Sequence, residues 1–279
     1  MNTKKYTNII IDGNNTICRA FYVKQKNDDE TVLLQFLRML KKIQMDYGKS
    51  KIYITWDIPA AKKESFRKNL CAYKATREVT DSTKRIHQLI PRARTLCAHL
   101  GLHEVLPYSL EADDVIYYLS RNMKNNLIIT ADHDLLQAVD ADNDVIIATT
   151  GILVNAENFE QIKGVPIDKY VLFKSVLGDK SDNVIGLSGY GAVKAKNLCL
   201  TENATNSLNQ EQNDIIENNK KIVDLQWAYD NFLEEHTFYE KQLLSPSIFD
   251  KEFLKKYLSE NNLKIEARNI EDYAKLFKQ

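Results

Sequence analysis

Hydrophobic residues follow two kinds of pattern along the chain. Four short runs rich in β-branched residues are apolar at their centres, as in strands buried on both faces of a sheet: 8–11, 51–55, 127–130 and 145–149. Between these runs, apolar residues recur at helical spacing, for example from Val32 to Ile43 and from Val115 to Met123. The alternation of strands and helices predicts an α/β fold with a mostly parallel central sheet.

The pattern changes after Gly151. A predicted helix runs from Pro166 to Val176, and the glycine-punctuated stretch GDKSDNVIGLSGYG leads into another helix. We therefore expect an α/β core at 1–155 and a helical subdomain at 156–279.

The end of the chain is less regular. Residues 201–220 are rich in Asn, Gln and Glu, which indicates a solvated loop or a mobile pair of helices. Helical spacing returns at 225–233 and 253–263, but the sequence does not indicate what these helices pack against.

Composition sets few limits on function. Basic and acidic residues both number 38, so the net charge is no evidence for or against nucleic acid. The cysteines are widely spaced and lack a zinc-binding pattern, which predicts buried, reduced thiols: Cys18, Cys71, Cys97 and Cys199. No secretory signal and no run of roughly 18 apolar residues is visible, so we expect a cytoplasmic protein.

Acidic residues follow three of the four predicted strands. Asp12 ends the first strand, Asp57 follows the second, and Asp132 and Asp134 follow the third. A single Asp in this position is more often a turn or cap residue than a ligand. In a parallel sheet, however, the carboxyl ends of the strands meet at one edge, where ligands bind.

Further acids come from two helical segments. Glu111, Asp113 and Asp114 lie in the first turn of a predicted helix, where the helix dipole alone could explain them. Asp179 and Asp182 belong to the GDKSDN stretch. If all these acids converged, they would repel one another strongly unless a cation neutralised them. Carboxylates select Mg²⁺ or Mn²⁺, and two such ions roughly 4 Å apart can catalyse phosphodiester hydrolysis. The sequence thus predicts a metal-dependent nuclease.

Basic residues concentrate between the second and third strands: Lys62, Lys63, Arg67, Lys68, Lys74, Arg77, Lys84, Arg85, Arg92 and Arg94. Alone, they would indicate a solvated helix face, but beside an acidic edge they suit a polyanion that approaches metal ions. Gly186, Gly189 and Gly191 precede a helix that carries Lys194 and Lys196. Such glycines often make only a turn, although their N–H groups can also bind phosphate.

Other residues are interpreted as structural. Trp56 precedes Asp57 and is expected in the core, and His133 lies on a tight turn and is expected at the surface. Ser65 and Cys71 lack a neighbouring base, so covalent catalysis is not expected.

The motifs resemble those of the 5′ nucleases, which include flap endonucleases, phage 5′-3′ exonucleases and the 5′ nuclease domain of bacterial DNA polymerase I. The matching strings occur in family order: DGNNTICRAFY, WDIPAAKKESFRKNLCAYKATR, EADDVI, TADHDLLQ and GDKSDNVIGLSGYGAVKA. The resemblance implies a stand-alone, phage-type or bacterial enzyme with a PIN-like core. It also implies a helical arch at about 60–100 and a helix-hairpin-helix at about 168–200.

The resemblance also implies a role for each motif. The metal ligands would be Asp12, Asp57, Glu111, Asp113, Asp114, Asp132, Asp134, Asp179 and Asp182. Lys74 and Arg77 would meet the scissile phosphate, Arg67 would lie near it, and Tyr73 would stack on a base. DNA would also contact Lys84, Arg85, Gly186, Gly189, Gly191, Lys194 and Lys196, and the helix-hairpin-helix would bind K⁺. Val184 and Ile185 stand where many relatives have an Ile-Pro pair.

The implied activity is two-metal 5′-3′ exonuclease and flap endonuclease cleavage by a monomer. The substrates would be DNA with 5′ ends or flaps, RNA primers and RNA–DNA hybrids. One alternative is a DNA-structure-binding protein that has lost catalysis, although none of the matched acids is missing. Another is a PIN-like ribonuclease, which would not need the GLSGYG element or the region of Lys74.

Overall fold

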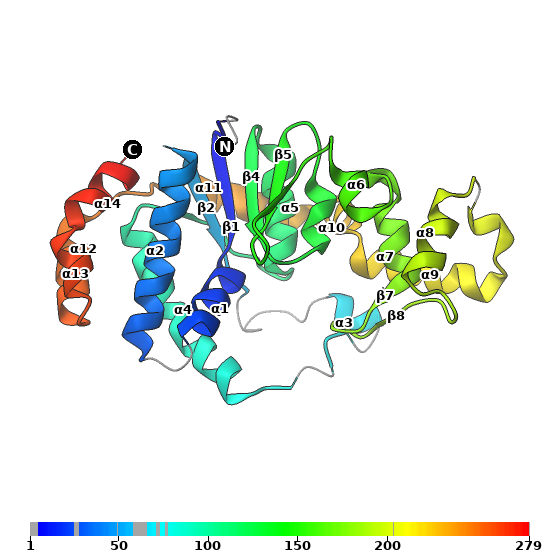
Figure 1. Ribbon diagram of the computed structural model, residues 1–279, viewed down its shortest axis with the longest axis horizontal. Coiled ribbons are helices and arrows are strands. Elements are labelled where there is room, and N and C mark those ends of the chain that lie inside the picture. Colours follow the sequence, from blue (N-terminus) through cyan, green and yellow to red (C-terminus); the bar gives the residue numbers. More distant parts are fainter. Residues whose placement is uncertain are drawn as a thin grey trace.

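A six-stranded sheet forms the centre of the molecule (Figure 1). The computed structural model describes residues 5–24, 28–48, 50–57, 66–70, 73–75, 78–202 and 204–278. The strands lie in the order β3-β2-β1-β4-β5-β6, and all neighbours are parallel except β6, which runs antiparallel to β5. Their bounds are β1 Asn8–Asp12, β2 Lys51–Thr55, β3 His103–Glu104, β4 Asn126–Thr130, β5 Asn143–Ile147 and β6 Ile152–Val154. The predicted mostly parallel sheet is confirmed.

Helices cover both faces of the sheet. On one face, Ile9 and Ile11 of β1 share a core with α1 (Gly13–Lys24), α2 (Asp29–Tyr47) and α4 (Asp81–His99). On the other face, Ile10 of β1 and Ile128 of β4 pack with α5 (Ala112–Asn122). Neighbouring residues of one strand therefore enter different cores, as expected for a strand buried on both sides. Trp56 is buried in the first core, as predicted.

The arch expected at about 60–100 falls on a segment of which the structure describes 66–70, 73–75 and 78–100. The short helix α3 (Phe66–Leu70) contacts the helix at Gln210–Val223 and is separated from α4 in the view of Figure 1. From Asp81 onward, the chain is instead a core helix, because α4 buries one apolar stripe against α1 and α2: Ile86, Leu89, Ile90, Ala93, Leu96 and Cys97. Thr80 accepts a hydrogen bond from Thr83 N and fixes the start of that helix.

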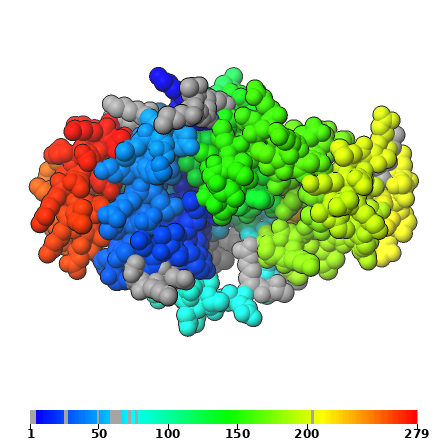
Figure 2. Space-filling model, in the orientation of Figure 1, coloured from blue at the N-terminus to red at the C-terminus, as the bar shows by residue number. Residues whose placement is uncertain are grey.

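Helices of the second half lie in three places. At one end of the molecule are α6 (Phe159–Lys163), η2 (Ile167–Lys169), α7 (Tyr170–Leu177), the β7-β8 hairpin (Gly178–Asp179 and Val184–Ile185), α8 (Ala192–Leu200), η3 (Ala204–Ser207) and α9 (Gln210–Val223). α10 (Leu225–Asn231) packs on α5, and α11 (Leu233–Leu243) contacts β3. At the opposite end, α12 (Lys251–Glu260), α13 (Lys264–Arg268) and α14 (Ile270–Phe277) join the core of α2 and α4. Figure 2 shows these two ends as the red and yellow extremes of an elongated surface.

Residues 156–279 therefore do not pack as one group, because the last three helices cover the α/β core. The polar segment at 201–220 is not a loop: it contains η3 and the greater part of α9, which packs along α7. Ile216 and Ile222 give α9 a buried face that its overall polarity hides.

The described part of the chain shows neither a membrane-spanning helix nor a disulfide bond. None of its helices is long and apolar enough to cross a membrane. Cys18, Cys97 and Cys199 are free thiols, and the last two are buried, as expected. Cys71 lies outside the described residues.

Three buried asparagines join the amino ends of the central strands. Asn126 accepts a hydrogen bond from Asn8 Nδ2 at 2.9 Å and donates one to Asn143 Oδ1 at 2.7 Å. Asn143 in turn donates to Asp140 Oδ1 at 2.8 Å. Because the side chains satisfy one another, β5 can begin two residues earlier than its apolar run.

We predict that Asn126→Ala lowers the free energy of unfolding by roughly 1–3 kcal/mol, because the buried Asn143 Oδ1 loses the hydrogen bond from Asn126 Nδ2, and Asn8 Nδ2 keeps only its bond to Lys124 O. Urea unfolding would measure this. Asn231→Ala, at an exposed site on α10, is the matched control and should change stability by less than about 0.5 kcal/mol. Equal effects of the two substitutions would contradict the proposed importance of this network.

Candidate metal centre and nucleic-acid interface

Asp12 and Asp132 lie side by side where β1 and β4 end. The carboxylate of Asp12 is buried and accepts hydrogen bonds from Asn15 N at 2.9 Å and Thr130 Oγ1 at 3.0 Å. The same Thr130 hydroxyl accepts from Asp132 N at 2.9 Å. One threonine at the end of β4 thus holds both acidic segments.

Asp57 connects the end of β2 to the start of α5. Its backbone N–H donates to Asn14 Oδ1 at 3.1 Å, and its carboxylate accepts from Ala112 N at 2.9 Å. A Cβ on Gly13 would lie 2.6 Å from Thr55 O, so only glycine lets α1 begin this close to β2. The DGNN motif therefore has two roles: it supplies Asp12, and its Gly13 and Asn14 hold the backbone at Asp57 in place.

Burial, and then repulsion among these acids, raises their pKa values. Burial, Asp57 and Asp132 raise the pKa of Asp12 to about 7. Burial together with Asp132, Asp12 and Asp57 raises the pKa of Asp113 well above its usual value. Asp57 borders solvent, but the protein around it weakens its hydration and, with Glu111, raises its pKa. The acids of β1, β2, β4 and α5 thus lie within electrostatic reach of one another.

A second group forms around Lys174 of α7. Its ammonium lies 2.8 Å from Asp134 Oδ1 and 3.0 Å from Asp179 Oδ2. Burial raises the pKa of Asp134 to about 6 despite Lys174. Burial acts against ionisation of Asp179, but hydrogen bonds from Ser181 and Lys174 outweigh it and lower the pKa to about 2. Sequence reasoning missed Lys174, although its place five residues before Asp179 on an amphipathic helix was visible.

Residues 73–75 tie the basic segment to both acidic groups. Tyr73 Oη lies 3.0 Å from Glu111 Oε2 and 3.1 Å from Asp182 Oδ2. Lys74 Nζ donates to Glu111 Oε1 at 2.9 Å, and Lys74 N donates to Asp182 O at 3.0 Å. Lys74 has φ 55°, a conformation that is uncommon outside glycine and is found most often at functional sites. The ring of Tyr73 is buried against Val184, so it is not available for base stacking in this structure.

The guanidinium of Arg67 is buried and hydrogen-bonded inside the protein. Its two terminal nitrogens donate to the two oxygens of Asp114 at 2.7 Å each, and its Nε donates to Ile222 O at 2.8 Å. The side chain is 3% exposed, so it does not face an approaching phosphate. Asp114 also accepts from Glu111 N at 3.0 Å, so this pair joins α3 and α9 to the first turn of α5.

The other predicted basic residues are scattered. Arg77, Lys62 and Lys63 lie outside the described residues. At the start of α4, Lys84 is exposed and pairs with Asp81, while Arg85 pairs with Asp29 of α2 at 2.6 Å. The fold does not bring Lys84 or Arg85 into contact with the acids described above.

The glycine-rich element forms an open turn before α8. Gly189 has φ 79°, and nothing lies within 4 Å of a Cβ built on Gly189 or Gly191, so the backbone is accessible. Gly186 is different, because its Cβ would lie 2.2 Å from Leu177 O where the hairpin meets α7. Lys194 is exposed. The ammonium of Lys196 turns back, since it lies 2.6 Å from a Cβ built on Gly164.

Two residues of α11, also missed in the sequence, fix the segment before Glu111. Glu235 is fully buried and accepts hydrogen bonds from Tyr108 N at 3.0 Å, Ser109 N at 2.7 Å and Ser109 Oγ at 2.6 Å. Gln242 bonds both backbone groups of Leu106 at 2.9 Å each. Helix α11 thereby holds the segment that connects β3 to α5.

The acids differ in whether a side-chain cation already neutralises them. Glu111, Asp114 and Asp134 already pair with Lys74, Arg67 and Lys174. Within the described ranges, no three Asp, Glu, His or Cys side chains gather around one point at ligand distance. The donors are hard carboxylate oxygens, which fit Mg²⁺ or Mn²⁺, and binding would require these ion pairs to rearrange.

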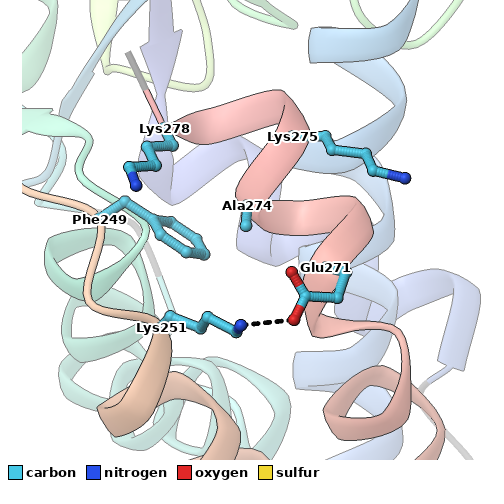
Figure 3. A pocket seen from close by; sticks show the side chains of 6 residues that line it. All are labelled: Phe249, Lys251, Glu271, Ala274, Lys275 and Lys278. Carbon is cyan, nitrogen blue, oxygen red and sulfur yellow. Dashed lines mark ion pairs between the residues drawn. The ribbon is translucent and has the colours of Figure 1, made fainter.

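A cavity of about 690 Å³ lies elsewhere, between α14 and the start of α12 (Figure 3). It is lined by Phe249, Lys251, Glu271, Ala274, Lys275 and Lys278. Lys251 already pairs with Glu271, and none of the predicted site residues lines this cavity.

Comparison with known proteins identifies the family. Residues 7–164 match the model of the 5′-3′ exonuclease N-terminal, resolvase-like domain. The chain is 32% identical to a 5′-3′ exonuclease of Mycoplasmopsis pulmonis over 199 residues, which cover 68% of this chain and 65% of that protein. It is 32% identical to a 5′-3′ exonuclease of Mycoplasma pneumoniae, over 68% of this chain and 70% of that one.

Solved structures show the same fold. The bacteriophage T5 D15 flap endonuclease, determined as a variant in a complex with DNA and metal ions, superposes with a TM-score of 0.67. The match covers 85% of this chain and 97% of the phage protein at 18% identity. Together with the matched domain and the curated relatives, this fold shows that the chain belongs to the 5′-3′ exonuclease family of nucleases.

Proposed function

We propose that this nuclease hydrolyses phosphodiester bonds of DNA at 5′ ends and 5′ flaps with the help of divalent metal ions. The observation that carries the proposal is the set of acids at the carboxyl edge of the sheet, whose burial and mutual repulsion raise their pKa values. Such a cluster is stable in its charged form only when a cation neutralises it. RNA primers and RNA–DNA hybrids are proposed as further substrates.

Two groups of acids are proposed to hold metal ions. Asp12, Asp113 and Asp132 would form the first, with Asp57 and Glu111 acting directly or through water. Asp134, Asp179 and Asp182 would form the second beside Lys174. Bound Mg²⁺ or Mn²⁺ would lower the pKa of a water and neutralise charge on the phosphate. The T5 flap endonuclease, with the same fold, has been determined with metal ions, which supports this proposal.

Lys74 is proposed to act on the scissile phosphate together with Arg77. The ammonium of Lys74 opposes the burial that raises the pKa of Asp57 and Asp113, so it lies within electrostatic reach of the proposed metal site. In the metal-free protein, Lys74 neutralises Glu111. A metal ion at these acids would take over that task and leave the ammonium free for a phosphate oxygen.

Arg67 is proposed to position Glu111 rather than to contact substrate. Its bidentate contact with Asp114, whose carboxylate accepts from Glu111 N, holds the first turn of α5. The open backbone at Gly189 and Gly191, with the start of α8, is proposed to bind a duplex phosphate and K⁺.

The central prediction concerns an end-labelled 5′-flap duplex. The wild-type protein should release the flap with Mg²⁺ but not with EDTA, and Asp132→Ala should reduce the rate at least about 100-fold, because it removes a metal ligand. Asp142→Ala, an acid that precedes β5 at the opposite edge of the sheet, is the matched control and should retain activity.

Three other outcomes would change the assignment. Binding of the flap without any cleavage would favour a DNA-structure-binding protein. Cleavage of single-stranded RNA with indifference to duplex DNA would favour a PIN-like ribonuclease. Release of a 3′ flap alone would contradict the proposed polarity.

A second prediction concerns the metal-free protein. The folded-state pKa values of Asp12, about 7, and Asp134, about 6, exceed the ordinary value of 3.8. The folded state therefore binds more protons than the unfolded state. Its free energy of unfolding should fall as pH rises from about 5 to about 8 in EDTA, because these protons are then lost. Asp179 has a lowered pKa of about 2 and stays ionised throughout, so it does not oppose this trend. Urea midpoints would show the fall, and Asp12→Asn should reduce it. A flat profile for wild type would contradict the raised pKa values.

A third prediction separates Arg67 from its neighbour Lys68. Arg67→Ala should lower the free energy of unfolding by roughly 3–5 kcal/mol, because it leaves the buried carboxylate of Asp114 unpaired. Lys68→Ala, at an exposed position of the same helix, should change it by less than about 0.5 kcal/mol. If urea unfolding gave the two variants equal stability, the positioning role would be wrong.

A further inference from the structure

A buried carboxylate of α11 holds the segment that leads into the acidic first turn of α5. Glu235 is fully buried, and its two oxygens accept three hydrogen bonds. One oxygen accepts from Tyr108 N at 3.0 Å, and the other accepts from both Ser109 N at 2.7 Å and Ser109 Oγ at 2.6 Å. Hydrogen bonds to an ionised acceptor are among the stronger ones in proteins, so this contact fixes the backbone at Ser109 firmly.

The place of Ser109 in the chain links this contact to the metal-site acids. One residue separates Ser109 from Glu111, and Asp113 follows in the same first turn of α5. Tyr239 of α11 is also close to that turn, because its pKa is raised by burial and by the charges of Glu235 and Asp114. The backbone that carries these acids is therefore held by a helix that lies outside residues 7–164, the part that matches the family model.

This hold differs from the others on the same turn because it involves no proposed ligand. The carboxylate of Asp57 accepts from Ala112 N at 2.9 Å, but a bound ion would compete for the oxygens of Asp57. The carboxylate of Glu235 is buried and already accepts three hydrogen bonds, so it is not available to an ion. It can therefore hold the turn equally in the metal-free and the metal-bound protein.

We infer that Glu235 is a positioning residue of the metal site, which sets metal affinity by fixing the backbone from which Glu111 and Asp113 project. Groups that orient metal ligands without touching the metal typically contribute roughly 10- to 100-fold to affinity. The helical second half of the chain thus determines how tightly the acidic edge binds Mg²⁺ or Mn²⁺. This inference rests on the proposed metal site.

The test is Mn²⁺ binding by the protein without DNA, followed by the electron paramagnetic resonance signal of unbound Mn²⁺. In Glu235→Gln, an amide NH₂ group replaces one acceptor oxygen, so at least one of the three hydrogen bonds is lost. We expect the Kd for Mn²⁺ to rise roughly 10-fold. Ser109→Ala removes only the Oγ bond and should raise the Kd less. The double variant should raise it by less than the product of the two single changes, because both act on one contact.

Glu266→Gln is the matched control. Glu266 of α13 is also buried, and it accepts a hydrogen bond from Arg38 Nε at 3.2 Å among the helices that contain no proposed metal ligand. Both glutamine variants should lower the urea midpoint, but Glu266→Gln should keep the wild-type Kd for Mn²⁺. The inference is overturned if Glu235→Gln and Ser109→Ala bind Mn²⁺ like wild type, or if Glu235→Gln and Glu266→Gln weaken binding equally. If Glu235→Gln does not fold, Ser109→Ala alone decides between these outcomes.

Cleavage of the flap duplex gives a second comparison. Glu235→Gln should need a higher Mg²⁺ concentration for half-maximal rate, while its KM for the duplex stays that of wild type. A change in KM with an unchanged Mg²⁺ dependence would contradict a role at the metal site.

Hydrogen exchange in EDTA separates this inference from the proposed function. The amides of Asp114 and Val115, which donate to Glu111 O, should exchange faster in Glu235→Gln than in wild type or Glu266→Gln. Equal exchange in all three proteins would overturn the positioning role. Failure of wild type to bind Mn²⁺ would instead overturn the proposed metal site, and the exchange comparison would still decide whether Glu235 holds this turn.

Discussion

Repulsion between carboxylates at the carboxyl edge of the sheet is the constraint on which the rest of the site depends. Parallel strands necessarily bring Asp12, Asp57 and Asp132 to one edge, and α5 adds Asp113 above them. In the absence of metal, the protein limits the free-energy cost of this repulsion in two ways. It raises the pKa of Asp12 and Asp113, and it places Lys74 and Lys174 beside the acids that flank them.

The cations near the site divide according to burial. Arg67 is buried, and each of its three side-chain nitrogens donates to Asp114 or Ile222 O, so its charge stabilises the fold. Lys74 and Lys174 are partly exposed and pair with acids that a metal could neutralise instead. Lys163 makes no ion pair with a carboxylate among the described residues, but Asp134 lies near enough to oppose the lowering of its pKa. Charge of the same sign thus performs different tasks according to what lies within about 4 Å of it.

Hydrogen bonds from distant segments keep the acidic edge rigid. Glu235 of α11 holds the backbone immediately before Glu111, and Asn14 of α1 holds that of Asp57. At the other edge of the sheet, Asn126 ties β1 to β5. The ligand-bearing ends of the strands therefore rest on a scaffold whose polar groups are paired inside the protein.

The sequence by itself determined the sheet and the acids of its carboxyl edge, because strand periodicity and strand-end residues are local features. It also determined the family, since five motifs occur in a fixed order. Short strands such as β3 and the packing of α12 against α4 carry too little local signal to be predicted. Only the tertiary structure decided that Arg67 is buried, that Tyr73 faces the core, and that Lys163 and Lys196 meet. Each of these depends on contacts between residues far apart in the chain, where charge and polarity alone do not reveal the partner.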